Sequence, residues 1–134
     1  MRAAAARQPV GREAMRERQR RGRTATPPIR ARYPGLDSLQ IEFEFTDHGK
    51  FVPSRQVTVL HPSAPAFFCF ACPFGDCDGE FDLTSAVDLI ARSGQLQASG
   101  EMRCAGTRHR VVACTLCLEY SISPHRNQAG GVVT

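Results

Sequence analysis

Six cysteines in two clusters are the residues of this chain whose type and spacing are best suited to chemistry. They are Cys69, Cys72, Cys77, Cys104, Cys114 and Cys117. A structural zinc ion takes four soft ligands at tetrahedral angles, and the ligands usually come as pairs from tight loops. Six cysteines are too many for one four-cysteine site and too few for two. In a reducing compartment such clusters indicate metal binding rather than disulfides. The spacing therefore predicts one structural Zn²⁺ site.

Local sequence selects four of the six cysteines as ligands. The predicted set is Cys72, Cys77, Cys104 and Cys114. Proline and glycine lie between the first two cysteines, where the chain must reverse direction around a metal. Gly79 and Gly106 each follow a cysteine by two positions, where glycine allows unusual backbone angles and leaves room for amides near the sulfur. Residues 105–113 are then expected to form a hairpin loop whose two ends face the metal.

Other ligand sets stay open at this point. Two Cys-x-x-Cys pairs would use Cys69 and Cys117 instead, but Cys117 falls on the polar side of a predicted strand and Cys69 alternates away from Cys72. A free cysteine often behaves as a small buried hydrophobe. His109 is a reserve ligand, because its distance from Cys104 repeats the spacing between Cys72 and Cys77. A lone histidine near cysteines is weak evidence, so an exposed loop residue is favoured.

The segment from Cys72 to Phe81 reads Cys-Pro-Phe-Gly-Asp-Cys-Asp-Gly-Glu-Phe. It resembles a zinc-ribbon knuckle, Cys-Pro-x-Cys-Gly, widened by two residues, as in a small bacterial zinc-binding protein. Cys104-Ala-Gly106 and Cys114 match the second half loosely. The resemblance implies a β fold held together by the metal and a binding module rather than a reaction.

Hydrophobic periodicity indicates the elements that must position the cysteines. Residues 39–45 alternate between apolar and polar side chains, which is typical of a half-buried strand. Further strands are expected at 57–60, 66–71, 95–104 and 116–122, with 66–71 central because it is apolar on both faces. One helix is expected at 85–93, ending at Gly94. The fold class predicted is α+β, with a small antiparallel sheet of about five strands.

Charge separates a basic arm from an acidic body, and glycine and asparagine after Pro124 mark a tail. Residues 1–32 hold ten arginines and two glutamates, whereas the rest carries a net charge of −4. A segment this polar and charged buries too little surface to order itself. We therefore expect a disordered basic arm at 1–32, a zinc-containing domain at 33–123 and a flexible tail at 124–134.

The expected function is that of a small non-enzymatic zinc-binding module. Four thiolates leave no open metal position for water, so the site is structural. The basic arm favours an RNA or DNA backbone as partner through phosphate attraction, assisted by Arg103, Arg108, His109 and Arg110; a protein partner is nearly as well supported. The alternative is a thiol redox protein, or a redox- or zinc-responsive switch, that uses the Cys-x-x-Cys pairs. Redox cysteines need a lowered pKa, often at a helix N-terminus, whereas both pairs here lie in strand patterns.

The first residues lack the apolar core of a secretory signal, and no stretch is long and apolar enough to span a bilayer. A cytoplasmic protein without a membrane partner is therefore expected.

Overall fold

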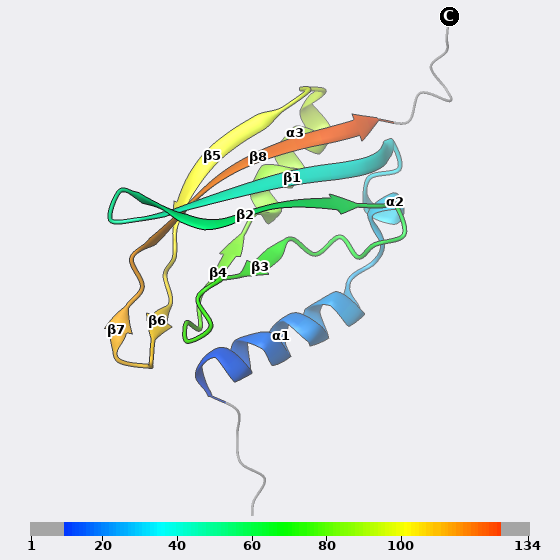
Figure 1. The fold of residues 1–134 in the computed structure, drawn as a ribbon. Helices are drawn as coiled ribbons and strands as arrows, with labels where there is room; N and C mark the ends of the chain where they lie inside the picture. Colours follow the sequence, from blue (N-terminus) through cyan, green and yellow to red (C-terminus); the bar gives the residue numbers. More distant parts are fainter. Residues whose placement is uncertain (1–9, 127–134) are drawn as a thin grey trace, which may run out of the picture.

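A four-stranded antiparallel sheet lies at the centre of the fold (Figure 1). The computed structural model describes residues 10–126, except for the side chains of residues 53–55. The strands of the sheet are β1 (Leu36–Asp47), β2 (Lys50–Leu60), β5 (Ala98–Arg103) and β8 (Leu116–Arg126), in the order β2-β1-β8-β5. Helices and short strands cover one face of this sheet. The predicted α+β class with a small antiparallel sheet is confirmed.

The alternation of β1 determines which face of the sheet is covered. Leu39, Ile41 and Phe43 are buried, while Glu42 and Glu44 between and beyond them point to the other face. β1 pairs with β2 on one side and with β8 on the other, so it is a central strand. Ile41 pairs with Ile122 of β8, which is also buried.

Helix α3 (Thr84–Ser93) packs on the covered face and confirms the helix predicted at 85–93. Val87 and Ile90 are its fully buried side chains. The helix ends at Gly94 in the left-handed conformation (φ 78°), as expected of a residue just beyond a helix. At its start, the Asp82 carboxylate accepts a hydrogen bond of 2.9 Å from the backbone N–H of Thr84.

Two ribbons of two short strands each complete the β structure. One pairs β3 (Cys69–Ala71) with β4 (Glu80–Asp82), and the other pairs β6 (Thr107–Arg108) with β7 (Val112–Ala113). The segment 66–71 was expected to be a central strand of the main sheet, and it is not. It is apolar on both faces because it lies between the main sheet and a helix. The ring of Phe70 packs edge-on against the ring of Phe43 in β1, and the ring centroids are 5.0 Å apart.

Residues 11–25 differ from the predicted disordered arm. They form helix α1 (Gly11–Ala25), which lies along the β3–β4 ribbon (Figure 1). Met15 is fully buried and Gln19 is 2% exposed. The sequence showed a single large apolar residue, but the interface is largely polar: the Gln19 amide donates hydrogen bonds to the carbonyl oxygen of Cys69 and to the Glu80 carboxylate. Hydrogen bonding offsets the cost of burying such a polar group.

The ends of the chain also differ in part from the expectation. Short helix α2 (Ile29–Arg32) fixes the segment after α1, because Ile29 is buried and its N–H donates to the carbonyl oxygen of Ala64 at 2.8 Å. Strand β8 continues to Arg126, so residues 124–126 of the predicted tail are in the sheet. The predictions for residues 1–9 and 127–134 lie outside the described residues.

Candidate metal centre

Four buried cysteines meet where the two short ribbons approach each other. They are Cys72, Cys77, Cys104 and Cys114, the four that the sequence singled out, and all their sulfur atoms lie within 4.8 Å of one another. Cys72 and Cys77 lie in the loop between β3 and β4. Cys104 and Cys114 flank the β6–β7 hairpin, which occupies residues 105–113 as predicted. The site therefore joins two hairpins that are distant in the sequence.

The sulfur positions fit a single tetrahedral metal ion. The Cys77 and Cys104 sulfurs are 3.6 Å apart, and those of Cys72 and Cys114 are 4.0 Å apart. Four sulfurs at a zinc–sulfur distance of about 2.3 Å are separated by about 3.8 Å at tetrahedral angles. The four thiols are thus close to the arrangement that one ion requires.

Two glycines make the close approach of the hairpins possible. The N–H groups of Gly79 and Gly106 donate to the sulfurs of Cys77 and Cys104 at 3.3 and 3.4 Å, respectively. A Cβ atom on Gly79 would lie 2.3 Å from the Cys104 sulfur, and one on Gly106 would lie 2.3 Å from the backbone nitrogen of Gly79. Both positions therefore require glycine. Hydrogen bonds from N–H groups to the sulfurs also stabilise the thiolate form.

Backbone contacts hold the two hairpins in register beside the cysteines. The Asp78 carboxylate accepts a 2.7 Å hydrogen bond from the N–H of Thr107, and the N–H of Asp78 donates to the Thr107 carbonyl oxygen at 3.3 Å. Within the hairpins, the N–H of Cys72 donates to Gly79 and that of Cys114 to Gly106. These bonds hold the backbone at Cys72 and Cys114 and set the register of the two hairpins beside the cluster.

Burial disfavours the thiolate form of two of the four cysteines. It raises the pKa of Cys104 to about 12, and it also raises the pKa of Cys72. A thiolate is the form that binds metal, and a metal ion supplies the positive charge that stabilises it. The four buried thiols could therefore hold a metal ion.

Arg12 of α1 lies directly on the loop that carries two of the cysteines. Its Nη1 donates to the carbonyl oxygens of Cys72, Phe74 and Cys77, at 2.7, 2.8 and 3.0 Å. Sequence reasoning missed this residue. No signal marked Arg12 among ten arginines of similar spacing.

The other candidate ligands lie outside the cluster. Cys69 in β3 and Cys117 in β8 are half-buried. Burial, followed by the neighbouring Asp82 carboxylate, raises the pKa of Cys69 to about 12. His109 is 74% exposed in the β6–β7 turn, and its Nε2 lies 2.6 Å from the Asp76 carboxylate.

Two of the four basic residues that were expected to assist nucleic-acid binding, Arg108 and His109, are paired with an acidic residue. The Arg108 guanidinium binds the Asp76 carboxylate at 2.9 Å and stacks 4.2 Å from the centre of the Phe74 ring. The hydrogen bond from Arg108 is the main cause of the lowered pKa of Asp76. Arg108 and His109 thus hold the turn against the cysteine loop, and they are not a free cationic surface.

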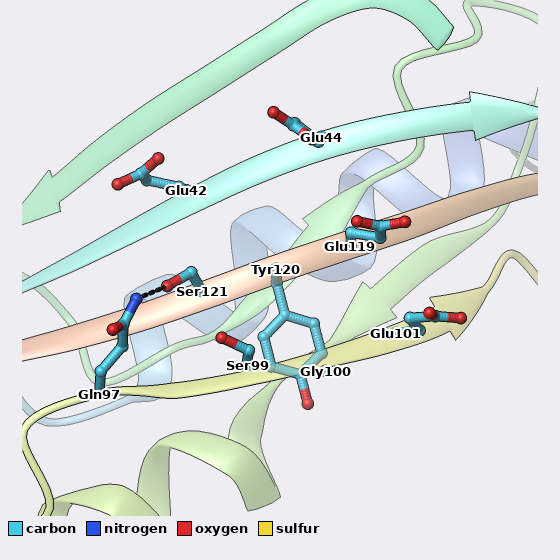
Figure 2. Close-up of a pocket in the computed structure, with 9 residues that line it drawn as sticks. All are labelled: Glu42, Glu44, Gln97, Ser99, Gly100, Glu101, Glu119, Tyr120 and Ser121. Carbon is cyan, nitrogen blue, oxygen red and sulfur yellow. Dashed lines mark hydrogen bonds between the residues drawn. The ribbon is translucent and has the colours of Figure 1, made fainter. Parts of the chain in front are cut away.

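The uncovered face of the main sheet bears a groove of different character (Figure 2). Its lining includes four carboxylates, those of Glu42, Glu44, Glu101 and Glu119. Glu119 pairs across strands with both Glu44 and Glu101, so three like charges lie in a row. The Tyr120 side chain packs on the backbone of Gly100. A Cβ atom on Gly100 would lie 2.4 Å from the Tyr120 hydroxyl oxygen. This face is acidic, and the arginine-rich helix packs beyond the opposite face (Figure 1).

Among residues 10–126, no helix is long and apolar enough to cross a membrane. Comparison of the chain with protein-family models, with curated proteins and with solved structures found no match.

Proposed function

We propose that this chain is a small non-enzymatic protein with a structural zinc site. The ligands are Cys72, Cys77, Cys104 and Cys114. The observation that carries the proposal is the meeting of four buried thiols within 4.8 Å. Soft thiolates in a tetrahedral set select zinc or iron among common ions. Four protein ligands leave no position for water or substrate, so the metal holds the two hairpins together and does no hydrolytic chemistry.

The proposal predicts a single zinc ion per chain after purification without added metal. Alkylation of the native protein should label at most Cys69 and Cys117, because metal-bound thiolates in a buried cluster are inaccessible. Treatment with a strong chelator should expose the other four. Elemental analysis and mass spectrometry of the alkylated protein measure both quantities. A metal-free protein in which all six cysteines react at similar rates would contradict the proposal. Bound iron in place of zinc would show that the site is right and that the proposed metal is wrong.

The redox alternative has weaker support. A redox cysteine must ionise easily, whereas burial raises the pKa of Cys69. In each Cys-x-x-Cys pair one member belongs to the four-cysteine cluster and the other does not. A zinc-responsive change of conformation remains compatible with the site.

The partner we propose is a nucleic-acid backbone that binds to α1. Arg16, Arg20 and Arg23 are exposed at spacings of four and three residues, so they lie along one side of the helix. They span about 10.5 Å along the helix axis at 1.5 Å per residue, close to three steps of one strand of B-DNA at about 3.4 Å each. The acidic sheet face would turn away from a polyanion, so α1 would face it. A protein partner is the other candidate.

Replacing Arg16, Arg20 and Arg23 together by glutamine should weaken binding to random-sequence duplex DNA. Each lost phosphate contact lowers the slope of log K against log salt concentration by about 0.9. We expect the slope to fall by about 2 to 3 in fluorescence anisotropy titrations. Lys50→Gln, which changes an exposed cation at the start of β2, is the control and should leave the slope unchanged. Failure of the zinc-loaded protein to bind at low salt would exclude this partner but not the zinc site.

A further inference from the structure

Three carbonyl oxygens converge on a single nitrogen of Arg12. Two belong to Cys72 and Cys77, and the third belongs to Phe74 in the turn between them. Carbonyl groups within one loop converge in this way only when the loop is closed into one conformation. Hydrogen bonds from a charged donor are among the stronger ones in proteins. Arg12 can therefore make all three hydrogen bonds only while the cysteine loop is closed.

The remaining polar contacts of α1 go to the same ribbon. Gln19 donates to the carbonyl oxygen of Cys69 in β3 and to Glu80 in β4, and Arg18 pairs with Glu80 at 3.2 Å. Among residues 10–126, the hydrogen bonds that α1 side chains donate to the rest of the fold all end between Cys69 and Glu80. The helix is thus held by the element that carries two of the four cysteines.

Neither the ribbon nor the helix is stable by itself. β3 and β4 have three residues each, and a two-stranded ribbon is marginal in water even when it is longer. An isolated helix of 15 residues is also marginal. The α1 sequence has six arginines and two glutamates, and its like charges repel each other. Phe81 of β4 anchors the ribbon in the apolar core, and closure of the cysteine loop supports the end of the ribbon that Arg12 contacts.

We propose that Arg12 couples occupation of the metal site to docking of α1, so that loss of the metal releases the arginine-rich helix. This inference rests on the proposed zinc site. Metal binding closes the loop between Cys72 and Cys77, and the closed loop presents its carbonyl oxygens to Arg12. The coupling is reciprocal, because a docked helix must raise the affinity for the metal by the factor by which the metal favours docking. Arg12 is a positioning residue, since it touches the ligand loop and not the sulfurs.

Limited trypsin digestion tests the coupling directly. Trypsin cleaves after arginine in extended chain, so cleavage at Arg16, Arg20 and Arg23 reports undocking of α1. In the wild-type protein, chelation should accelerate this cleavage at least about tenfold, before cleavage at Arg103 in the main sheet begins. In the zinc-loaded Arg12→Gln variant, the same sites should be cut about tenfold faster than in wild type, and the zinc affinity should fall by a similar factor. Mass spectrometry locates the cuts, and a competing chelator measures the affinity.

Arg21→Gln is the matched control, because Arg21 is an exposed arginine of the same helix. It should leave both the zinc affinity and the protection of Arg16 and Arg20 unchanged. The coupling is overturned if a zinc-loaded Arg12→Gln protein is as protected and binds zinc as tightly as Arg21→Gln. It is also overturned if α1 of the wild-type chain stays protected after the metal has been removed, a measurement that needs no variant to fold. Both results would leave the zinc site standing, whereas a wild-type chain that binds no metal would end both proposals.

Discussion

Cys77→Ser should release the metal and lower the free energy of unfolding by at least about 4 kcal/mol. The binding free energy of structural zinc is about 10–16 kcal/mol in zinc-finger peptides, and it adds to the stability of the fold that presents the ligands. Whole domains are stable by only about 5–15 kcal/mol. Cys77 is fully buried, so a serine hydroxyl there would also lack water and a suitable partner. Zinc content and urea denaturation followed by circular dichroism measure the two effects.

Cys117→Ser is the control for this loss. It is the same chemical change in a half-buried cysteine of β8 that lies outside the four-thiol cluster. We expect full zinc content and a stability within about 1 kcal/mol of wild type, as for most substitutions away from special sites. Equal zinc content in the Cys77→Ser and wild-type proteins would show that the ligand set is different.

The parts of the fold that were predictable are those in which local pattern and tertiary role agree. Leu39, Ile41 and Phe43 alternate with polar residues, and this alternation alone places them in the core of a half-buried strand. Helix α3 combines an apolar stripe with Gly94 at its end. For the four cysteines the useful signal was not their pairing as Cys-x-x-Cys. It was the glycine two positions after Cys77 and after Cys104.

Docking of α1 could not be predicted because its interface is polar. Arg12 and Gln19 look like surface residues in the sequence, and their acceptors are backbone carbonyl oxygens 50 to 65 positions away. No pattern in the sequence of α1 encodes those acceptors. The wrong prediction for segment 66–71 follows from this missed helix. One apolar face of the segment packs on the main sheet and the other packs on α1. The resemblance to a zinc-ribbon knuckle stays a prediction.

Two kinds of stabilisation are present in different parts of this fold. The main sheet, α3 and the β3–β4 ribbon share one apolar core, which includes Ile41, Ile90 and Phe81. The two short ribbons and α1 are joined by backbone hydrogen bonds, two glycines and the four cysteines. The β6–β7 ribbon has no fully buried strand residue, whereas β4 contributes Phe81 to the core. The metal would therefore contribute most to the β6–β7 ribbon and to the loop between Cys72 and Cys77. We therefore expect metal loss to affect the ribbons and α1 first.

Gly79→Ala should both destabilise the fold and weaken zinc binding. The added Cβ atom would lie 2.3 Å from the Cys104 sulfur and 2.9 Å from the backbone nitrogen of Gly106. The sulfur cannot rotate away without leaving the four-cysteine cluster, and the nitrogen belongs to the backbone, so the two hairpins would have to separate. Overpacking of this kind typically costs about 1–3 kcal/mol, and disturbing groups that orient metal ligands lowers metal affinity about 10- to 100-fold. We expect a loss of stability of about 3 kcal/mol and a zinc affinity lowered at least tenfold.

Gly75→Ala is the matched control in the same cysteine loop, because a Cβ atom there meets nothing within 4 Å. Its zinc affinity should equal that of wild type. Gly106→Ala should reproduce the defect of Gly79→Ala, since its Cβ would meet the Gly79 backbone at 2.3 and 2.4 Å. Competition with a chelator and urea denaturation would measure all three variants. If Gly79→Ala bound zinc as tightly as Gly75→Ala, the hairpins would not meet back to back at these glycines, and the geometry of the four-cysteine site would be different.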